Sequence, residues 1–324
     1  MLFDLRPKES RRDLYGRDEE LEELARLVES GSWVVVVGRR MTGKTSLVKT
    51  FAREFGGAYV NLMGVRGLEG LVEALHSQAG FKLRELTLDL KLVKATWSRA
   101  LMDAFKAFEG SVLVLDEVQE LASPQFLKVL KRVWDTYPGL RLVFTGSLTG
   151  VLRGLLEPSP SSPLYGRSPV KLELKPFTRE ASLRFLKEGF RELKVQVSEG
   201  ELEEVVDSFN GYVGWLTYYG NLRAVRKLSH REALNKAWSE GAAVMKEELE
   251  RFLQGRRREV YVRALRAMAL GARWSELKRL LGVNPKVLSG VLKTLRGAMI
   301  VSEESGLYYI PDPVTRRAVQ LLKA

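Results

Sequence analysis

The sequence predicts an α/β core in which helices flank a parallel sheet, followed by a helical middle part and a small C-terminal domain. Residues 33–37 form an uninterrupted, mostly β-branched apolar run, which is typical of a strand buried on both faces. Two further segments are predicted to be strands: in 111–121, four apolar residues lead into Asp116 and Glu117, and 140–150 ends its strand in Thr145, Gly146 and Ser147. Residues 178–250 instead place apolar side chains at helical spacing, which predicts several amphipathic helices.

The other elements follow in chain order. Residues 1–12 are mainly polar and are expected to form a loose arm, whereas 14–28 carry a leucine stripe typical of a helix. We expect helices at 46–55, 68–80 and 92–108, and strands at 57–62 and 170–174. The Pro- and Ser-rich stretch 158–163 predicts an exposed loop, and Thr178 is expected to cap the next helix with Ala181 at its third position.

A glycine-rich segment joins the first strand to the following helix. It fits G-x-x-x-x-G-K-[ST] at every fixed position, and its backbone N–H groups are suited to phosphate. Lys44 would reach the β- and γ-phosphates and Thr45 would bind Mg²⁺ through its hydroxyl. The alternative is a loop that only turns a strand into a helix. The candidate nucleotide-binding residues are Gly38, Arg39, Arg40, Met41, Thr42, Gly43, Lys44, Thr45 and Ser46.

Two carboxylates, Asp116 and Glu117, follow the apolar run at 111–115. In a parallel sheet this run would deliver them to the edge that carries the glycine-rich loop. Asp116 would then serve the Mg²⁺ shell and Glu117 would orient or deprotonate a water. Two solvated carboxylates opening a loop are the alternative. The next strand ends in Thr145 and Ser147, whose hydroxyls would either sense a phosphate or cap a helix.

The composition limits the chemistry. The chain has 324 residues, enough for two or three domains, and no cysteine, which excludes disulfides and thiol catalysis. His76 and His230 are its only histidines, so a multi-histidine metal site or a histidine triad is not expected. No signal pattern and no apolar run of about 18 residues appears. We therefore expect a cytoplasmic protein with no membrane partner.

The basic charge is concentrated near the C-terminus. Residues 251–324 contain 15 Lys/Arg against 5 Asp/Glu, a net charge of +10, while residues 1–250 contain 37 against 35, a net charge of +2. Such an imbalance favours an anionic partner, most simply DNA, although charge that only aids solubility would produce the same count.

Residues 258–324 have the outline of a winged helix. Helical patterns at 258–271, 274–282 and 286–299 precede two short strands around a turn, and Asn284 and Pro285 are suited to start the third helix. In such domains the third helix enters the major groove, although winged helices also dock proteins. The candidate DNA contacts are Arg256, Arg257, Arg258, Lys286, Lys293 and Arg296.

Five sequence blocks together resemble a known family. They are LYGR (14–17), GRRMTGKTS (38–46), LDEVQEL (115–121), TGSLTG (145–150) and PLYGRSPVKLELKPF (163–177). In this order they are similar to the archaeal P-loop ATPases of the STAND/AAA+ group, relatives of the origin-recognition ATPases. The resemblance implies an α/β P-loop NTPase core with a helical lid and a C-terminal winged-helix domain, divided at 1–175, 176–255 and 256–324.

The resemblance also implies roles by position. ATP or ADP with Mg²⁺ would be the ligand, with Tyr15, Gly16 and Arg17 near the adenine and Thr145 and Ser147 on a sensor strand. Lys44 and Glu117 would be catalytic, with Thr45 and Asp116 on the metal. Arg167 lies where related ATPases carry an arginine finger, which would act in trans in a self-associated form. A salt bridge that fixes its loop is the alternative for Arg167.

One segment departs from the family pattern. The lid of this group shows a Gly-x-Pro turn, but here Trp215 stands in NGYVGWLTYYGN (210–221), and its aromatic residues are expected to pack in a core. Two functions remain open: an ATPase coupled to DNA, or a nucleotide-gated switch with slow turnover that acts through protein contacts. A kinase is a weaker third interpretation, because no acceptor-binding feature is evident.

Overall fold

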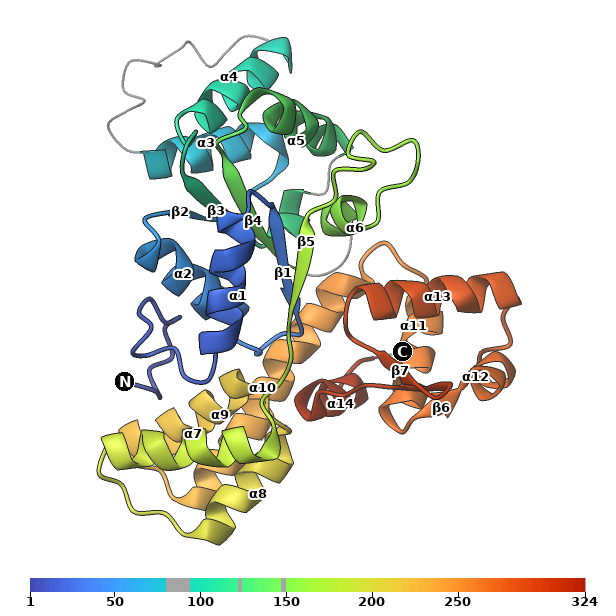
Figure 1. Cartoon of the computed structure of the whole chain (residues 1–324). Coiled ribbons are helices and arrows are strands. Elements are labelled where there is room, and N and C mark those ends of the chain that lie inside the picture. The colour runs from blue at the N-terminus through green and yellow to red at the C-terminus, as the bar shows by residue number, and fades with distance from the viewer. Residues whose placement is uncertain (80–93, 122–123, 147–149, 324) are drawn as a thin grey trace. The chain divides into compact units, whose positions relative to one another are not determined.

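The computed structural model describes residues 1–79, 94–121, 124–146 and 150–323 (Figure 1). The chain forms two compact units, which are described separately here. One comprises Pro7–Gly38 and Gly43–Leu174 and contains the large sheet. The other comprises Met1–Arg6, Arg39–Thr42 and Lys175–Ala324 and is mainly helical. The short segment 39–42 thus groups with the helical unit, although its neighbours on both sides along the chain belong to the sheet unit.

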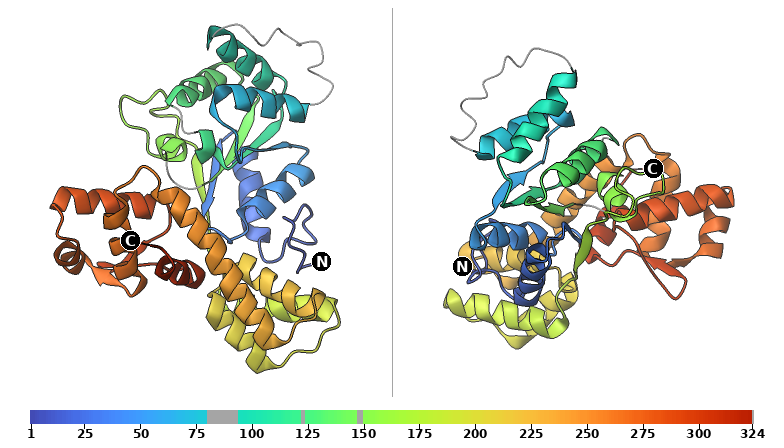
Figure 2. Two further views of the ribbon diagram at one scale, coloured as in Figure 1. Left: turned by 180° about the vertical axis from the view of Figure 1, so that it is seen from behind. Right: turned by 45° about the horizontal axis from the view of Figure 1, so that its top comes forward.

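The sheet unit is built on five parallel strands in the order β2-β3-β4-β1-β5 (Figures 1 and 2). Its strands are β1 (Val34–Gly38), β2 (Ala58–Asn61), β3 (Val112–Asp116), β4 (Arg141–Thr145) and β5 (Val170–Leu174). Its helices are α1 (Asp18–Glu29), α2 (Lys44–Glu54), α3 (Gly67–Ala79), α4 (Lys94–Lys106), the 3₁₀ turn η2 (Val118–Leu121), α5 (Pro124–Thr136) and α6 (Gly150–Leu156). The α/β core predicted from the sequence is confirmed.

The central position of β1 explains its composition. β4 and β5 pair with its two edges, and its four valines, 34 to 37, are fully buried. A strand enclosed on both faces needs apolar side chains at every position rather than at alternate ones. Leucines of α1 and α2, with Phe51, pack against this part of the sheet and form the core under the loop that leaves β1.

The helical unit begins with four α-helices and one π-helical turn. They are α7 (Arg179–Glu192), α8 (Glu199–Phe209), α9 (Val213–Gly220), the π turn η3 (Asn221–Val225) and α10 (His230–Leu253). The predicted cap of α7 is confirmed, because Thr178 accepts a hydrogen bond from Ala181 N at 3.1 Å. Tyr212, Trp215 and Tyr219 are at most 2% exposed and pack in a core as expected, whereas Tyr218 is half-buried and donates to Glu240.

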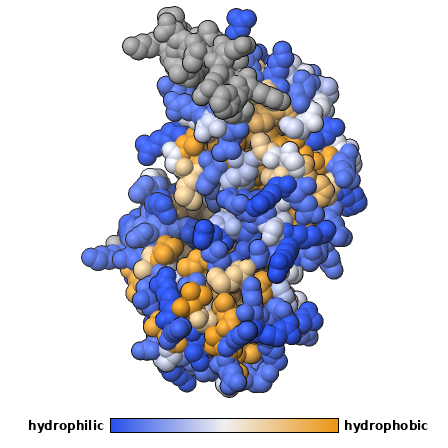
Figure 3. Space-filling model, turned by 90° about the vertical axis from the view of Figure 1, so that its left-hand side faces the viewer, coloured by the Kyte–Doolittle hydropathy of each residue, from blue (hydrophilic) through white to orange (hydrophobic). Residues whose placement is uncertain are grey.

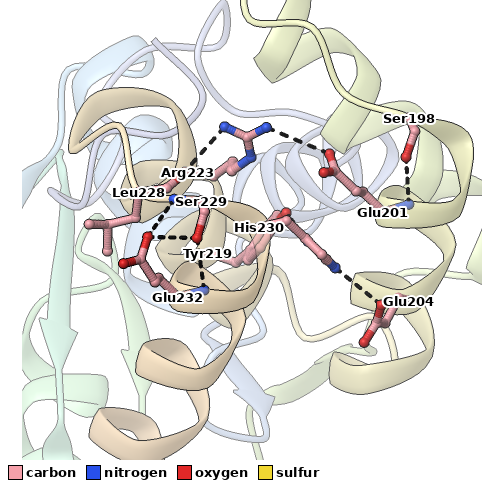
Figure 4. A network of polar contacts seen from close by, with 9 residues as sticks. All are labelled: Ser198, Glu201, Glu204, Tyr219, Arg223, Leu228, Ser229, His230 and Glu232. Atoms are coloured by element: carbon pink, nitrogen blue, oxygen red, sulfur yellow. Dashed lines mark hydrogen bonds and ion pairs between the residues drawn. The ribbon is translucent and has the colours of Figure 1, made fainter.

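A polar network ties α8, α9 and α10 together (Figure 4). His230 Nδ1 lies 2.9 Å from the Tyr219 hydroxyl and His230 Nε2 lies 3.1 Å from Glu204 Oε2. A neutral imidazole satisfies both contacts when Nδ1 accepts and Nε2–H donates. Ser229 and Glu232 form a capping box that starts α10, which fixes the position of His230 at the first turn of this helix.

The expectation of a loose N-terminal arm is wrong. Leu2 and Phe3 are buried, and the Phe3 ring packs edge-to-face on Phe185 and Phe190. Asn221 Nδ2 donates to Phe3 O at 2.9 Å, and Leu2 N donates to Glu192 Oε2 at 2.8 Å. Residues 1–12 are mostly polar, but Leu2 and Phe3 are buried, and the Phe3 ring packs against α7 close to Gly189 and Gly220.

The C-terminal part contains α11 (Arg258–Ala269), β6 (Ala272–Arg273), α12 (Trp274–Leu281), α13 (Pro285–Gly297), β7 (Ser302–Glu304), β8 (Leu307–Tyr309) and α14 (Pro313–Gln320). The three strands form an antiparallel sheet in the order β6-β8-β7. Gly282 ends α12 in the left-handed conformation, and Asn284 caps α13 with Pro285 in its first turn, as the sequence predicts. β6 and α14 were not predicted.

On the face drawn in Figure 3, hydrophilic residues predominate and apolar residues form smaller patches among them. No helix within the described ranges is long and apolar enough to span a bilayer.

Candidate functional site

Three neighbouring strands of the sheet end in residues suited to phosphate and metal chemistry. Gly38, Thr145 and Asp116 are the last residues of β1, β4 and β3. Because β4 lies between β1 and β3, the glycine-rich loop and the carboxylates are two strand spacings apart, or about 10 Å. This edge of a parallel sheet is where α/β proteins bind their ligands.

The glycine-rich loop runs from Gly38 into α2. Gly43 is the N-cap of α2 with φ 95°, a conformation that favours glycine, and no side chain caps the helix. Lys44 Nζ donates to Gly38 O at 2.8 Å across the loop, and Thr42 Oγ1 donates to Arg39 O at 2.7 Å. The first turn of α2 has no acidic residue, so its N–H groups and helix dipole are suited to an anion.

The carboxylate of Asp116 is 2% exposed and accepts two hydroxyl groups. Thr145 Oγ1 donates to its Oδ1, and the Tyr59 hydroxyl donates to its Oδ2 at 2.6 Å. Burial, followed by the nearby Asp116 charge, raises the pKa of Tyr59, so the phenol keeps its proton and remains a donor. Tyr59 was not singled out from the sequence, because its role depends on the pairing of β2 with β3.

Glu117 follows Asp116 in an uncommon backbone conformation, with φ 62°. Its N–H donates to Thr145 Oγ1 at 3.3 Å, and Gln119 Nε2 donates to its Oε2. A positive φ at a residue other than glycine carries strain of order 1–3 kcal/mol and is most often retained at functional sites. Gln119 is a second residue that the sequence did not single out, and it fixes the orientation of the Glu117 side chain.

The donor set fits a magnesium ion held together with a nucleotide. No group of three or more His, Asp or Glu side chains within the described ranges is arranged to hold a metal by itself. Mg²⁺ at phosphate sites takes one or two protein ligands and completes its shell with phosphate oxygens and water. The half-buried Thr45 hydroxyl, which has no hydrogen-bond partner among the described residues, and Asp116 can supply these ligands.

Arg39, Arg40 and Met41 make contacts inside the helical unit. Arg39 donates to Met299 O and to Ser302 Oγ, Arg40 pairs with Glu248, and Met41 O accepts from Gly214 N at 2.9 Å. Of the other candidate nucleotide contacts, Ser46 Oγ accepts from Lys8 N at 3.1 Å, and Ser147 lies outside the described residues.

The segment before α1 is well fixed. Gly16 has φ 61°, and Arg17 is 5% exposed, acts as the N-cap residue of α1 and pairs with Glu20 at 2.5 Å. Tyr15 is half-buried beside them. The three residues 15–17 therefore form an ordered turn.

Arg167 lies on the loop before β5, and its Nε is 3.5 Å from Asp135 Oδ1. Asp135 also pairs with Lys131 at 2.6 Å, and hydrogen bonding to Lys131 lowers the pKa of this carboxyl. Within one chain, Arg167 therefore makes the salt bridge that was the alternative to a finger role. The finger role in trans stays a prediction.

The candidate DNA contacts differ in how far their charges are compensated. Lys286 and Lys293 are exposed on α13, and Arg257 is exposed before α11. Arg296 pairs with Glu303 at 2.7 Å, and Arg258 donates to Glu250 Oε1 at 2.8 Å and to Lys323 O at 3.0 Å. The guanidinium of Arg256 lies over the Phe252 ring, 4.2 Å from its centroid.

Comparisons with known proteins agree with this geometry. The chain is 30% identical to a Walker-type ATPase of Pyrococcus abyssi, with a TM-score of 0.87 over 99% of this chain and 100% of the other. It shares its fold with the ORC2 protein of Aeropyrum pernix, solved as ADPNP–ADP complexes, at 19% identity and a TM-score of 0.63 over 99% and 96% of the two chains. The ORC1 protein of the same organism, solved in complex with DNA, matches at 18% identity and a TM-score of 0.50 over 95% and 93%.

No curated protein matches the sequence. Residues 14–218, more than half of the chain, match the model of one family. The strands that end in the glycine-rich loop, Thr145 and Asp116 all lie within this range. The chain belongs to the family of ATPase domains found predominantly in Archaea, and it is an ATP-binding P-loop ATPase.

Proposed function

We propose that this protein hydrolyses ATP with Mg²⁺ and couples its nucleotide state to rearrangement of its domains on DNA. The observation that carries the proposal is the common sheet edge at which the phosphate loop, Thr145 and the pair Asp116–Glu117 meet. A loop that only turned a strand into a helix would not need two carboxylates and a hydroxyl beside it.

The reaction is attack of water on the γ-phosphate. Glu117 orients the water and accepts its proton as the new O–P bond forms and the bond to the ADP oxygen breaks. Lys44 and the backbone N–H groups at the start of α2 stabilise the charge that develops on the phosphate oxygens. Thr45 and Asp116 would hold Mg²⁺, which would supply further charge neutralisation. Hydrogen bonds from Tyr59 and Thr145 hold Asp116 in one orientation.

The other site residues enter the proposal through the family. Residues 15–17 would line the adenine, Arg39 to Met41 and Ser46 would complete the loop around the phosphates, and Ser147 would join Thr145 on the sensor strand. Arg167 would act in trans as an arginine finger after exchanging Asp135 for a neighbouring nucleotide. We further propose a core at 1–175, a lid at 176–255 and a winged helix at 256–324.

The winged-helix assignment draws on the order of elements in the C-terminal part. Three helices, one short strand between the first two and a hairpin after the third form the expected pattern, with α13 as the recognition helix. Lys286, Lys293 and Arg296 follow one another at helical spacing on its exposed face. Gly290 lies between them, and a Cβ atom there would meet no atom within 4 Å. A basic helix face that has no side chain at its centre is suited to approach a DNA groove closely.

The test is ATP hydrolysis by the unmodified protein and by Glu117→Gln, each with and without duplex DNA at low and moderate salt. We expect Glu117→Gln to lower turnover by at least about a hundredfold while nucleotide still binds, because its amide cannot take the proton. Lys44→Ala should lose nucleotide affinity. Equal turnover by the unmodified protein and Glu117→Gln would contradict the assigned role.

DNA binding is tested separately by a salt-dependent electrophoretic shift. Replacing Lys286 and Lys293 together by alanine should weaken binding and make the dependence of log K on log [salt] shallower by about two. Replacing Arg258, whose charge Glu250 already compensates, should change this slope less. Absence of any shift at low salt would exclude duplex DNA as the partner.

A second candidate is a nucleotide-gated STAND-type switch with slow turnover that acts through protein contacts. The observation that favours it is the pairing of Arg258 and Arg296 with Glu250 and Glu303, which reduces the charge available to phosphates. A slow steady-state rate that DNA leaves unchanged would support the switch, and stimulation by DNA would support the first proposal.

A further inference from the structure

The variable residues of the phosphate loop are held by partners far away in the sequence. The motif fixes Gly38, Gly43, Lys44 and Thr45 but leaves positions 39–42 free. In this chain those four residues belong to the same compact unit as residues 175–324. Residues 39–41 have partners in α9, in α10, in the chain just after α13 and at the first residue of β7.

The contact with α9 is made through the backbone. The first N–H groups of a helix have no partner within the helix, and Tyr212, the N-cap residue of α9, provides no side-chain cap. Gly214 N donates instead to Met41 O at 2.9 Å. A Cβ atom at position 214 would lie 2.5 Å from Met41 Sδ, 2.9 Å from its Cβ and 3.1 Å from its Cα. Only glycine allows this approach.

Met41 is itself in a conformation that needs support. Its φ of 63° lies in the left-handed region, which is costly for a long side chain. The hydrogen bond from Gly214 and the packing of the two residues hold it there. The shape of the phosphate loop at this point therefore depends on α9.

Arg39 and Arg40 add further contacts between the phosphate loop and the helical unit. Arg39 Nη1 donates to Met299 O at 3.4 Å and its Nη2 donates to Ser302 Oγ, so one guanidinium reaches both the chain just after α13 and the first residue of β7. A cation is favoured at the C-terminal end of a helix. Arg40 pairs with Glu248 on α10.

We propose that Gly214, Glu248 and Ser302 are positioning residues for the phosphate loop, and that they set nucleotide affinity through Met41, Arg40 and Arg39. Their role is exerted through these three loop residues, and it rests on the proposed nucleotide binding at this loop. Holding the loop in its binding shape before ATP arrives reduces the ordering cost at the moment of binding. The same attachments link the loop to the end of α13, the proposed recognition helix.

The first test uses two alanine substitutions of helix glycines in the same unit. Gly214→Ala forces the loop to move, whereas Gly200→Ala in α8 meets no atom within 4 Å. Both raise helix propensity equally. We expect Gly214→Ala to weaken binding of fluorescent methylanthraniloyl-ADP about tenfold and Gly200→Ala to leave it within about twofold, with both variants folded by circular dichroism.

Adding Met41→Gly to Gly214→Ala removes the side chain that collides and suits a positive φ, so it should recover most of the lost affinity. A general loss of folding would not be rescued in this way. Equal affinity for Gly214→Ala and Gly200→Ala would overturn the proposal, as would a loss that Met41→Gly leaves unchanged.

The second test removes a hydroxyl. Ser302→Ala takes away one acceptor of Arg39, and Ser239→Ala removes an exposed serine of α10 whose hydroxyl only donates to Lys236 O. We expect a loss of nucleotide affinity of about threefold to tenfold for Ser302→Ala and none for Ser239→Ala. Equal affinity of these two variants would remove Ser302 from the proposal. Absence of binding by the unmodified protein would refute the nucleotide site itself, together with this inference.

Discussion

Phe3→Ala tests whether the N-terminal segment is part of the folded helical unit. The Phe3 ring is fully buried, with centroids 5.8 Å and 5.0 Å from those of Phe185 and Phe190 in edge-to-face packing. Truncating a buried phenylalanine costs about 3–5 kcal/mol, and the two aromatic pairs place this site toward the upper end. We expect local stability around α7 and η3 to fall by about 4–5 kcal/mol.

A double-mutant cycle makes the assignment specific. A Cβ atom at Gly220 would lie 2.5 Å from Phe3 Cε1, so Gly220→Ala alone should cost about 1–3 kcal/mol through overpacking. In the Phe3→Ala background the same methyl group enters the vacated space. The combined loss should therefore be smaller than the sum of the single losses by at least about 1 kcal/mol.

Hydrogen exchange followed by mass spectrometry is the suitable assay, because the chain forms two compact units and exchange reports each peptide separately. Peptides from α7 and α9 should exchange faster in Phe3→Ala, while peptides from the sheet should not change. Leu5→Ala, at a side chain 46% exposed, is the control from the same segment. Unchanged protection of α7 in Phe3→Ala, or strict additivity in the cycle, would refute the packing described here.

Three further predictions concern other parts of the chain. Asp312→Ala removes the cap that accepts two backbone N–H groups at the start of α14, which should cost about 1–2 kcal/mol in urea unfolding; an unchanged midpoint would contradict this. The hydrogen bond from His230, with the neighbouring charge of Arg231, lowers the pKa of Glu204. Ionised Glu204 therefore stabilises the fold above the ordinary carboxyl pKa, and this stabilisation is lost as the pH falls through the lowered value. Glu204→Gln should therefore lower the melting temperature near neutral pH. Its difference from the unmodified protein should shrink as the pH falls below the ordinary glutamate pKa of about 4.3 and vanish at more acidic pH; a gap that persisted in acid would count against it. Tyr59→Phe deletes the 2.6 Å hydrogen bond to Asp116, and we expect the Mg²⁺ concentration for half-maximal ATP hydrolysis to rise roughly fivefold, the equivalent of about 1 kcal/mol; an unchanged Mg²⁺ titration would show that Asp116 does not depend on Tyr59.

Much of the fold follows from local patterns in the sequence. The apolar runs before Gly38, Asp116 and Thr145 became the three central strands, and the caps at Thr178 and Asn284 started helices where they were expected. The prediction for the N-terminal segment failed because burial of Phe3 depends on Gly189 and Gly220, 186 and 217 positions away, where a Cβ atom would collide with the Phe3 ring. No local pattern carries that information.

The candidate site likewise contains residues that the sequence identifies and residues that it does not. Lys44, Thr45, Asp116 and Glu117 were identifiable because phosphate and magnesium require particular groups directly after particular strands. Tyr59 and Gln119 carry no such local signal. Tyr59 reaches Asp116 only through the pairing of β2 with β3, and Gln119 reaches Glu117 only through the 3₁₀ turn that follows β3.

The two arginines of the phosphate loop show why a motif and its variable positions obey different constraints. Phosphate dictates the loop frame, so the frame can be recognised from eight consecutive residues. Arg39 contacts Ser302 and Arg40 contacts Glu248, more than 200 positions away in each case. Nothing in the motif specifies an arginine at position 39 or 40. Substitutions at positions 39–41 should then be tolerated only together with changes at 214, 248 or 302. Exchanging Arg40 and Glu248 for each other tests this: the swap should restore more nucleotide affinity than either single change retains, and additive losses would show that the pair does not position the loop.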